Sequence, residues 1–423
     1  MANRNILSTR ALSFSYDGQA KALDSVSVDI PAGKKTVFLG PNGSGKSTLF
    51  LHFNGVHKPD SGEALFDGRP VGYDSKSLAS LRSQVSLVFQ NPDDQIFSAT
   101  VEEDVAFGPL NSGVARADAE RRVDEVLSLV GLSQMRERPT QQLSFGQRKR
   151  VALAGALAMR PKVLIMDEPT AGLDPEMVHE LLELSDELNH NGVTVVLSTH
   201  DVETAYEWAD EVRLLFNGQL IYSGGPDEFF SRPDIHDFGL APPMAFLLNQ
   251  QMHWRTGKAE KPHPRSFAEL TSKCFPLPHK KPGTLRLVCV NPLSAGLEGE
   301  TVPVPSFPAR AQQARTANPS STCAGETPAA PPSTPQPLSN SMREGAAHRR
   351  SGIYGSLARR LAAEGKIDAH YRFHALEHGL LHASLGDDFI LYTDAGLCSL
   401  VEARAKRLEE RSGLRISIEH EHP

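Results

Sequence analysis

The sequence has few cysteines, and their spacing is not typical of a zinc site or of a disulfide-rich scaffold. Cys274, Cys289, Cys323 and Cys398 are the 4 cysteines of the 423 residues, and no two of them form a CxxC pair. We therefore expect no disulfide framework. The chain also lacks the run of about 20 apolar residues that spans a bilayer, and its first residues lack the apolar core of a signal peptide. These absences predict a soluble protein that does not itself cross a membrane.

The chain also has no excess of positive charge that would point to nucleic acid. It carries 44 Lys and Arg against 51 Asp and Glu, a formal charge of −7. Residues 255–350 nevertheless hold 15 of the 30 prolines and carry +7, so the remainder carries −14. This division predicts an acidic globular domain at 1–240, a Pro-rich, disordered linker at 255–350 and a small α/β domain at 351–423. An added strand at 284–290 is left open.

A glycine-rich segment lies between an apolar strand and an apolar helix near the N-terminus. Residues 36–40 predict a short buried strand, and Leu49, Phe50 and Leu51 belong to the helix that follows. In this setting glycines let backbone N–H groups surround phosphate oxygens at a helix N-terminus. Lys46 would reach the β- and γ-phosphates of ATP, and the Ser47 hydroxyl would coordinate Mg²⁺. The predicted nucleotide-binding residues are Gly40, Pro41, Asn42, Gly43, Ser44, Gly45, Lys46, Ser47 and Thr48.

Two carboxylates follow a second apolar strand. Residues 162–166 predict this strand, and Asp167 and Glu168 come directly after it. Four consecutive apolar residues are typical of a parallel strand buried on both faces, and ligands of such sheets bind at the carboxyl ends of the strands. We therefore expect Asp167 to contact Mg²⁺ through water, and Glu168 to act as the general base or at least to orient the attacking water. The two motifs together predict an α/β P-loop nucleoside triphosphatase.

Further motifs carry a resemblance to one family of such enzymes. Leu143-Ser144-Phe145-Gly146-Gln147 resembles the signature of ABC-type ATPases, normally Leu-Ser-Gly-Gly-Gln, and the family's motifs follow in order over about residues 5–230. The resemblance implies a mixed sheet with a helical subdomain. It also implies that Tyr16 stacks on adenine, that Gln90 of the Q-loop lies beside Mg²⁺ and the reacting phosphate, that Asp174 lies in the D-loop and that His200 is the switch histidine on the γ-phosphate.

The resemblance implies that the signature faces ATP held by a second subunit. Ser144 stands where a helix N-cap is expected, and the N–H groups that follow an N-cap favour an anion. ATP would then lie between the phosphate loop of one chain and Ser144, Gly146 and Gln147 of the other, so the chain would pair with itself or with a homologous ABC ATPase. Phe145 replaces a family glycine, and it would be strained if this position required a positive φ.

Residues 90–109 resemble the energy-coupling-factor group of this family, and within it most of all the ATP-binding subunits of cobalt and nickel importers. In that group the region holds a coupling helix of a membrane subunit. Ile96, Phe97, Val101 and Phe107 could form the apolar floor of such a groove, or the segment could be ordinary loop-helix packing. The resemblance implies an ATPase that energises a prokaryotic importer of cobalt, with nickel or a vitamin as alternatives. It also implies integral membrane and substrate-binding partners and a peripheral location on the cytoplasmic face of the cell membrane.

The basic run Arg148-Lys149-Arg150 predicts a solvated helix start, because the surrounding domain is acidic. We therefore expect no nucleic-acid partner. A non-transport ABC ATPase is the alternative function. The chain lacks the long coiled coils and the second ATPase set that such relatives carry.

The last residues predict a small α/β unit of separate helices and strands. Helices are expected at 353–363, 367–382 and 397–411, with strands at 389–393 and 414–418. The second helix would carry four histidines at intervals of four residues, of which neighbours could chelate a transition metal, or they could simply be exposed. These candidate ligands are His370, His374, His378 and His382, with His420 and His422 as further ones.

Overall fold

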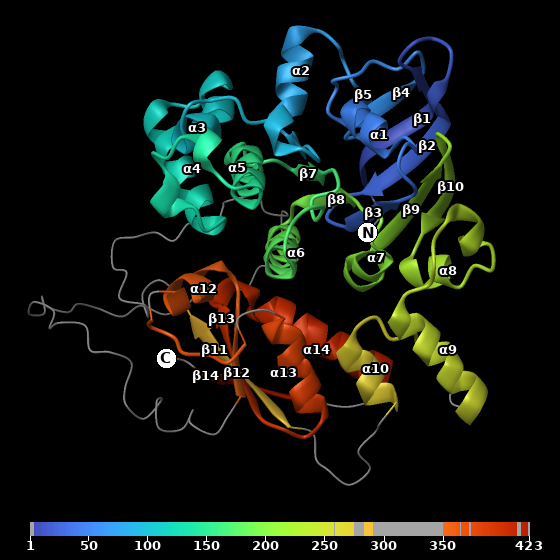
Figure 1. The fold of residues 1–423 in the computed structure, drawn as a ribbon, viewed down its shortest axis with the longest axis vertical. Coiled ribbons are helices and arrows are strands. Elements are labelled where there is room, and N and C mark those ends of the chain that lie inside the picture. The colour runs from blue at the N-terminus through green and yellow to red at the C-terminus, as the bar shows by residue number, and fades with distance from the viewer. Residues whose placement is uncertain are drawn as a thin grey trace, which may run out of the picture.

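A computed structural model describes residues 4–257, 259–274, 283–290, 350–363, 365–371, 374–412 and 416–421. Three sheets organise these residues, and Figure 1 shows the first two above a separate C-terminal sheet. In none of the described ranges is there a helix whose length and apolarity would let it cross a membrane.

The first sheet is antiparallel and the second is mostly parallel. The antiparallel sheet has the order β2 (Lys21–Pro31), β1 (Asn5–Ser15), β4 (Ser61–Phe66), β5 (Arg69–Pro70). The larger sheet has the order β10 (Gln219–Gly224), β9 (Glu211–Phe216), β3 (Lys35–Leu39), β8 (Thr194–Ser198), β7 (Val163–Met166), β6 (Val85–Val88), and only its β10–β9 pair is antiparallel. The expected mixed sheet is therefore confirmed.

Ten helices precede the C-terminal sheet in the described part of the chain. They are α1 (Lys46–Phe53), α2 (Ser75–Arg82), α3 (Val101–Asn111), α4 (Arg116–Leu129), α5 (Phe145–Ala158), α6 (Pro175–His190), α7 (Val202–Trp208), α8 (Pro226–Phe230), α9 (Met244–Thr256) and α10 (Phe267–Cys274).

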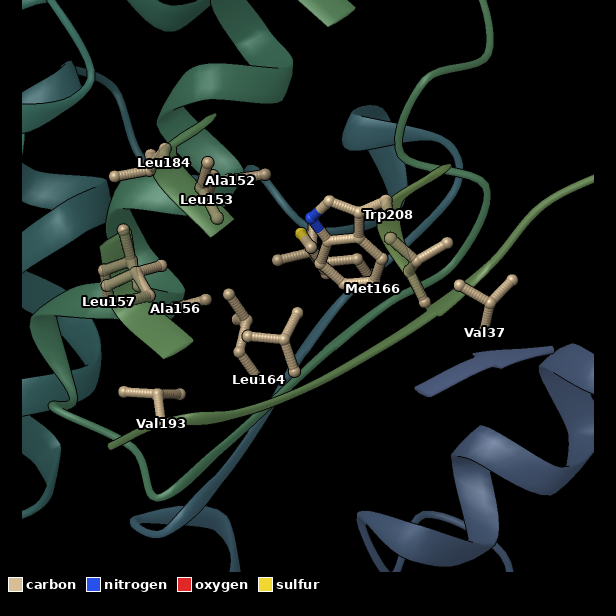
Figure 2. Close-up of a cluster of buried hydrophobic side chains, with 14 of the residues drawn as sticks. Val37, Ala152, Leu153, Ala156, Leu157, Leu164, Met166, Leu184, Val193 and Trp208 are labelled. Atoms are coloured by element: carbon tan, nitrogen blue, oxygen red, sulfur yellow. The ribbon is translucent and has the colours of Figure 1, made fainter. Parts of the chain in front are cut away.

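The larger sheet is buried on both faces because its strands send alternate side chains to opposite sides. Leu164 and Met166 of β7 join one core together with side chains of α3 to α6, part of which is drawn in Figure 2. Val163 and Ile165 of the same strand join the other core, which includes side chains of α1 and of the antiparallel sheet. The carboxyl ends of the parallel strands β3, β8, β7 and β6 lie at one edge of this sheet, where a polar site can form.

The C-terminal sheet is entirely parallel, with the order β12 (Arg350–Tyr354), β13 (Phe389–Asp394), β11 (Thr284–Val290), β14 (Ser417–Glu421). The helices α12 (Ser356–Ala363), α13 (Ala375–Ser384) and α14 (Cys398–Ser412) belong to this unit. Figure 1 shows it beside α6, with α10 packed next to α13 and α14.

The predicted extent of the linker is therefore wrong, and the open possibility of a strand at 284–290 is realised. β11 lies inside the sheet, where Leu285 and Leu287 are fully buried, and Ala268 of α10 belongs to the same core. Composition averaged over 96 residues hid these short apolar segments because prolines dominate the rest. The part of the linker between 291 and 349 lies outside the described residues.

Two of the predicted C-terminal helices also need correction. Residues 350–354 form a strand before α12, and the helix expected from 367 begins only at Ala375. Tyr371 instead pairs with Gly352 as an isolated bridge, so helical spacing does not apply to His370. The strand expected at 414–418 is shifted to 417–421. The strand expected at 389–393 and the helix expected at 397–411 match β13 and α14 within one residue.

The cysteines bring a further correction. Cys289 of β11 and Cys398 of α14 are paired as a disulfide across 109 residues. The absence of a CxxC pair predicted no disulfide framework, but spacing along the sequence does not show that β11 lies beside the start of α14.

Polar contacts dock the C-terminal unit onto one face of α6. Asp186 of α6 accepts hydrogen bonds from Arg404 Nη2 of α14 at 2.7 Å and from Lys35 Nζ of β3 at 2.6 Å. The Arg359 guanidinium pairs with Glu183 of the same helix. These side chains are largely buried, so the charges compensate one another away from water. Helix α6 thus connects the larger sheet to the C-terminal unit.

Candidate nucleotide-hydrolysis site

The phosphate loop between β3 and α1 has a backbone that requires glycine. Gly40, Gly43 and Gly45 have φ angles of 142°, 77° and 104°. A Cβ atom on Gly40 would lie 2.1 Å from the carbonyl oxygen of Leu215, and one on Gly45 would lie 2.6 Å from that of Ala22. Side chains are therefore excluded at two of these positions by space as well as by conformation.

Lys46 lies across this loop. Its Nζ donates to the carbonyl oxygens of Gly40 at 2.8 Å and Pro41 at 3.0 Å. Burial lowers the pKa of Lys46, and the carboxylates of Glu168 and Asp167 oppose this effect. The ammonium group is thus held over the loop within the field of both acids, where a phosphate would meet it.

The other residues of the loop differ in exposure. Ser44 is buried and its Oγ has no hydrogen-bond partner within the described chain. Pro41, Asn42 and Ser47 are exposed, and Thr48 is buried. An orphaned hydroxyl inside a glycine loop fits an anionic ligand, because such a group otherwise loses its hydrogen bond on burial.

Asp167 and Glu168 follow β7 as expected, and a serine that the sequence did not single out holds both. Ser198 Oγ, at the end of the neighbouring strand β8, donates to Asp167 Oδ1 at 2.5 Å and accepts from the Glu168 N–H at 2.8 Å. Ser198 is fully buried. The only available signal was its position two residues before His200 at a strand end.

The backbone and the carboxylate of Glu168 are held in one orientation by their surroundings. Its backbone φ is 43°, which is uncommon for a residue with a side chain. Its Oε2 lies 3.0 Å from His200 Nδ1, whereas its buried Oε1 has no partner within the described chain. The His200 side chain is 70% exposed and Gln90 is also exposed. One carboxylate oxygen is therefore oriented by the histidine, while the buried second oxygen has no hydrogen-bond partner in the described chain.

The signature serine caps α5. Ser144 Oγ accepts from the Gln147 N–H at 3.2 Å, and Gln147 Oε1 accepts from the Ser144 N–H at 3.0 Å. This capping box fixes the helix start and leaves Ser144 exposed. Phe145 is the first residue of the helix and has no positive φ. The strain considered for Phe145 is therefore absent.

The signature helix α5 packs closely on the D-loop (residues 171–174) and on the start of α6, at two glycines that face larger side chains. A Cβ atom on Gly172 would lie 2.9 Å from Cε1 of Phe145, and one on Gly146 would lie 2.6 Å from Cε of Met177. Asp174 caps α6, where its Oδ1 accepts from the Met177 N–H at 2.8 Å. The D-loop is thus held between Phe145 and the start of α6.

The prediction of a solvated basic run is wrong for Lys149. This residue is 7% exposed, and its Nζ donates to the carbonyl oxygens of Glu168 at 3.2 Å, Pro169 at 3.0 Å and Ala171 at 2.6 Å. Burial lowers its pKa to about 8. Lys149 therefore ties the signature helix to the segment that joins Glu168 to the D-loop. The run of charges hid this role, because periodicity does not distinguish one buried lysine from its solvated neighbours.

Tyr16 lies beside the phosphate loop. Its ring is 63% exposed, and its hydroxyl lies 3.1 Å from Thr48 Oγ1. Phe14 and His57 contact the ring edge to face. An exposed aromatic face next to α1 suits a planar base, although adenine stacking stays a prediction.

Two phenylalanines of the Q-loop region project from the surface, as the predicted apolar floor requires. Phe97 and Phe107 are 65% and 47% exposed, and their rings meet edge to face at 4.5 Å between centroids. Asp104 Oδ1 accepts from the N–H groups of Phe97 and Ser98 at 3.0 Å each and fixes this loop. Val101 is fully buried and cannot be part of such a floor. Its place in the prediction is therefore wrong.

The four histidines of the C-terminal unit do not share one site. The Nε2 atoms of His374 and of His179 on α6 lie 2.6 Å apart, whereas His370 Nδ1 lies 3.1 Å from Ser351 Oγ. The His378 ring stacks on Tyr371, and His382 contacts Arg350 and Asp387. Within the described ranges no group of three metal-ligand atoms includes any of the four. Of the four-residue series only His378 and His382 lie within α13, and metal binding by a neighbouring pair stays a prediction.

The fold and this site define a P-loop ATPase with a signature motif. Comparison with known proteins agrees with this class: the family profile described as "ABC transporter" matches residues 23–171. The chain is 49% identical over 226 residues to the energy-coupling factor transporter ATP-binding protein EcfA of Methanocaldococcus jannaschii, which covers 53% of this chain and 81% of that protein. It is 48% identical over 244 residues to the cobalt import ATP-binding protein CbiO of Rhodobacter capsulatus, and this match covers 57% of this chain and 87% of that protein.

A putative ABC transporter ATP-binding protein of Methanosarcina mazei is 45% identical over 273 residues, and the chain spans 60% of its length. Among solved structures, cbiO1 from Clostridium perfringens, part of the ABC transporter complex cbiONQ, matches with a TM-score of 0.51 and 39% identity over 61% of this chain and 98% of that chain. The chain belongs to the family of ABC transporter ATP-binding proteins, in its energy-coupling-factor group. Its members bind and hydrolyse ATP to drive transport.

Proposed function

We propose that this chain binds ATP on the loop from Gly40 to Thr48 and hydrolyses it with Glu168 as the general base. The observation that carries the proposal is the Glu168 carboxylate, which has one oxygen on His200 Nδ1 at 3.0 Å and a second, buried oxygen without a partner in the described chain. A carboxylate held in this way can orient a water molecule toward the γ-phosphate. His200 would then contact the same phosphate, and Gln90 would lie beside Mg²⁺ and that phosphate.

The residues present also fit Mg²⁺. The Ser47 hydroxyl, the Gln90 amide oxygen and the Asp167 carboxylate are oxygen ligands, which Mg²⁺ prefers. Asp167 is kept in place by Ser198, so it is suited to hold a coordinated water. When bound, the ion would neutralise charge that develops on the β- and γ-phosphates.

We propose that Ser144, Gly146 and Gln147 contact the ATP of a second subunit, either another copy of this chain or a homologous ABC ATPase. Ser144 is exposed at the N-terminus of a 14-residue helix, where N–H groups and the helix dipole favour a phosphate. ATP would then join two chains, and hydrolysis would release them. Asp174 and the D-loop would lie along the same contact.

The variant Glu168→Gln tests both proposals. We expect it to bind ATP normally and to accumulate as an ATP-bound dimer with kcat at least about 100-fold lower, because the amide cannot accept the proton of water. Size-exclusion chromatography with MgATP measures the dimer, and phosphate release measures kcat. Glu63→Gln, an exposed change on β4, is the matched control. A Glu168→Gln protein with normal turnover would exclude the base role.

We propose that the ATPase energises an importer through integral membrane and substrate-binding subunits, while it lies peripherally on the cytoplasmic face of the membrane. The exposed pair Phe97 and Phe107 supports a docking surface for an amphipathic helix. Phe97→Asp should abolish co-purification with the membrane subunits and leave basal ATPase activity of the isolated chain unchanged. Leu110→Asp, at another exposed position of α3, shows how far this surface extends.

Cobalt is the proposed substrate because a relative with 48% identity is named a cobalt import protein. Nickel and a vitamin such as biotin are the alternatives. Uptake of Co²⁺, Ni²⁺ and biotin by the complete complex in proteoliposomes would decide between them. A non-transport role would be favoured if the chain purified without membrane subunits and bound DNA or RNA in a salt-sensitive manner.

A further inference from the structure

Three metal-ligand side chains from distant parts of the sequence meet in the C-terminal unit. Cys289 lies in β11, Cys398 is the first residue of α14, and His420 lies in β14. One ligand atom from each lies within 4.8 Å of the other two. The distance from Cys289 Sγ to His420 Nδ1 is 3.8 Å. Within the described ranges this is the one group of three such ligands.

The parallel register brings these residues to one face of the sheet. β11 and β14 are adjacent, and Leu287 pairs with His420. Cys289 follows Leu287 by two residues, so Leu287, Cys289 and His420 point to the same side. Leu287 belongs to the core that also contains Val401 of α14. The start of α14 therefore places Cys398 over the end of these two strands.

A carboxylate orients the histidine. His420 Nε2 lies 2.9 Å from Glu402 Oε1, and Glu402 is one turn after Cys398 in α14. If Nε2 donates to this carboxylate, Nδ1 carries the lone pair and faces the two sulfur atoms. A carboxylate behind a histidine in this way is a common outer partner of metal-binding imidazoles.

We propose that the reduced chain binds a divalent cation of borderline softness, such as Zn²⁺ or Co²⁺, through Cys289, Cys398 and His420. Two thiolates and one imidazole are ligands that such cations prefer over Mg²⁺ or Ca²⁺. On a tetrahedral ion with ordinary bond lengths, a sulfur and a nitrogen ligand lie about 3.5 Å apart. The separation of 3.8 Å in the structure is close to this value. Three protein ligands leave a fourth position for water.

The disulfide between Cys289 and Cys398 is the alternative state of the same site. A thiol reductant converts it to two thiols, supplying two electrons and two protons as it forms its own disulfide. The cation then replaces the two thiol protons, which are released to solvent. The oxidised chain holds only the imidazole and binds the cation weakly.

The test uses the full-length chain without nucleotide, reduced with a phosphine that is then removed anaerobically, and titrated with Co²⁺. We expect one Co²⁺ per chain and a thiolate-to-cobalt charge-transfer band in the near ultraviolet. Cys289→Ser and Cys398→Ser should each weaken binding at least about 100-fold and reduce the band. Glu402→Gln should weaken it about 10- to 100-fold while it keeps the band, because Glu402 positions His420 without touching the ion.

Two variants serve as controls, and two results would overturn the proposal. Cys323→Ser removes a thiol elsewhere in the sequence, and His236→Ala removes an exposed imidazole of the ATPase unit; both should bind Co²⁺ as the unmodified chain does. Equal affinity in the reduced and the oxidised chain would overturn the proposal. So would an unchanged charge-transfer band in the Cys289→Ser, Cys398→Ser double variant.

Discussion

Replacing Ser198 by alanine should separate ATP binding from ATP hydrolysis. The Ser198 hydroxyl is the only group that the structure joins to both the Asp167 carboxylate and the Glu168 N–H in the described chain, at 2.5 Å and 2.8 Å. Alanine would leave a buried carboxylate oxygen and a buried N–H without this partner. It would also release Glu168 from a backbone conformation with φ of 43° that its surroundings must maintain.

The size of the effect follows from the two lost bonds. A hydrogen bond to a charged group contributes about 1.5–3 kcal/mol, and an unsatisfied buried N–H costs about 1–3 kcal/mol. Only part of this sum raises the activation free energy of hydrolysis, because the phosphate loop and the contact of the Glu168 carboxylate with His200 remain. If about 1.5–3 kcal/mol acts there, kcat falls roughly 10- to 100-fold. The affinity for ATP should change less than about threefold, since the hydrogen bonds of the Ser198 hydroxyl go to Asp167 and Glu168 and not to the phosphate loop.

Phosphate release under saturating MgATP measures kcat, and fluorescence titration with a nucleotide analogue measures affinity. Ser86→Ala is the matched control: Ser86 is also a buried strand serine, and its hydroxyl donates to the carbonyl oxygen of Ala156 at 3.0 Å, away from both acids. It should lower stability by only about 0.5–1.5 kcal/mol, because one neutral hydrogen bond is lost, and leave kcat unchanged. Normal turnover in Ser198→Ala, or an equal loss in Ser86→Ala, would refute the assignment.

Three further predictions concern the contacts around α5 and α6. Lys149→Met removes three bonds to the loop after Glu168 and should lower kcat at least about tenfold by phosphate release, with nucleotide affinity retained. Arg404→Ala breaks a buried pair with Asp186 and should lower the free energy of unfolding in urea by about 3 kcal/mol, whereas Arg10→Ala, in an exposed pair, should change it by less than about 1 kcal/mol. Burial first, and then His179 and His378, lower the pKa of His374 to about 4. The unfolded chain therefore takes up this proton first, so the contribution of His374 to stability should be constant above about pH 6.5 and fall as the pH decreases toward 4. His374→Gln should flatten that acid limb in thermal unfolding scans, and an unchanged limb would show that another group causes it.

Motifs that act through local backbone geometry were predictable from the sequence. The glycines of the phosphate loop, the acids after β7 and the N-cap serine of α5 each lie next to the segment that gives them their role. Ser198 and Lys149 were not predicted, because each acts on residues about 20 to 30 positions away in sequence. Such roles depend on which strands are neighbours and on which helical face is buried, and one sequence pattern does not specify either.

The C-terminal unit also contains elements that local sequence patterns did not predict. β11 is seven residues long and is separated from β12 by about 60 residues. Its partners in the sheet are therefore set by long-range pairing, and local composition favoured a linker instead. The start of the helix predicted at 367 was wrong for a related reason: intervals of four residues suggest a helix, but the chain from 365 to 371 forms turns and a bridge to Gly352.

Phe145 shows how a departure from a family motif can be accommodated by its own surroundings. Because this residue opens α5 in helical conformation, it needs no glycine. Its ring lies where a side chain on Gly172 would have to be, 2.9 Å from the position of that Cβ, and Lys149 Nζ lies 5.4 Å from the ring centroid. The larger signature residue thus makes glycine necessary in the D-loop, at a φ of 74° that glycine also favours. The ring and the lysine together connect the signature helix to the D-loop within one chain.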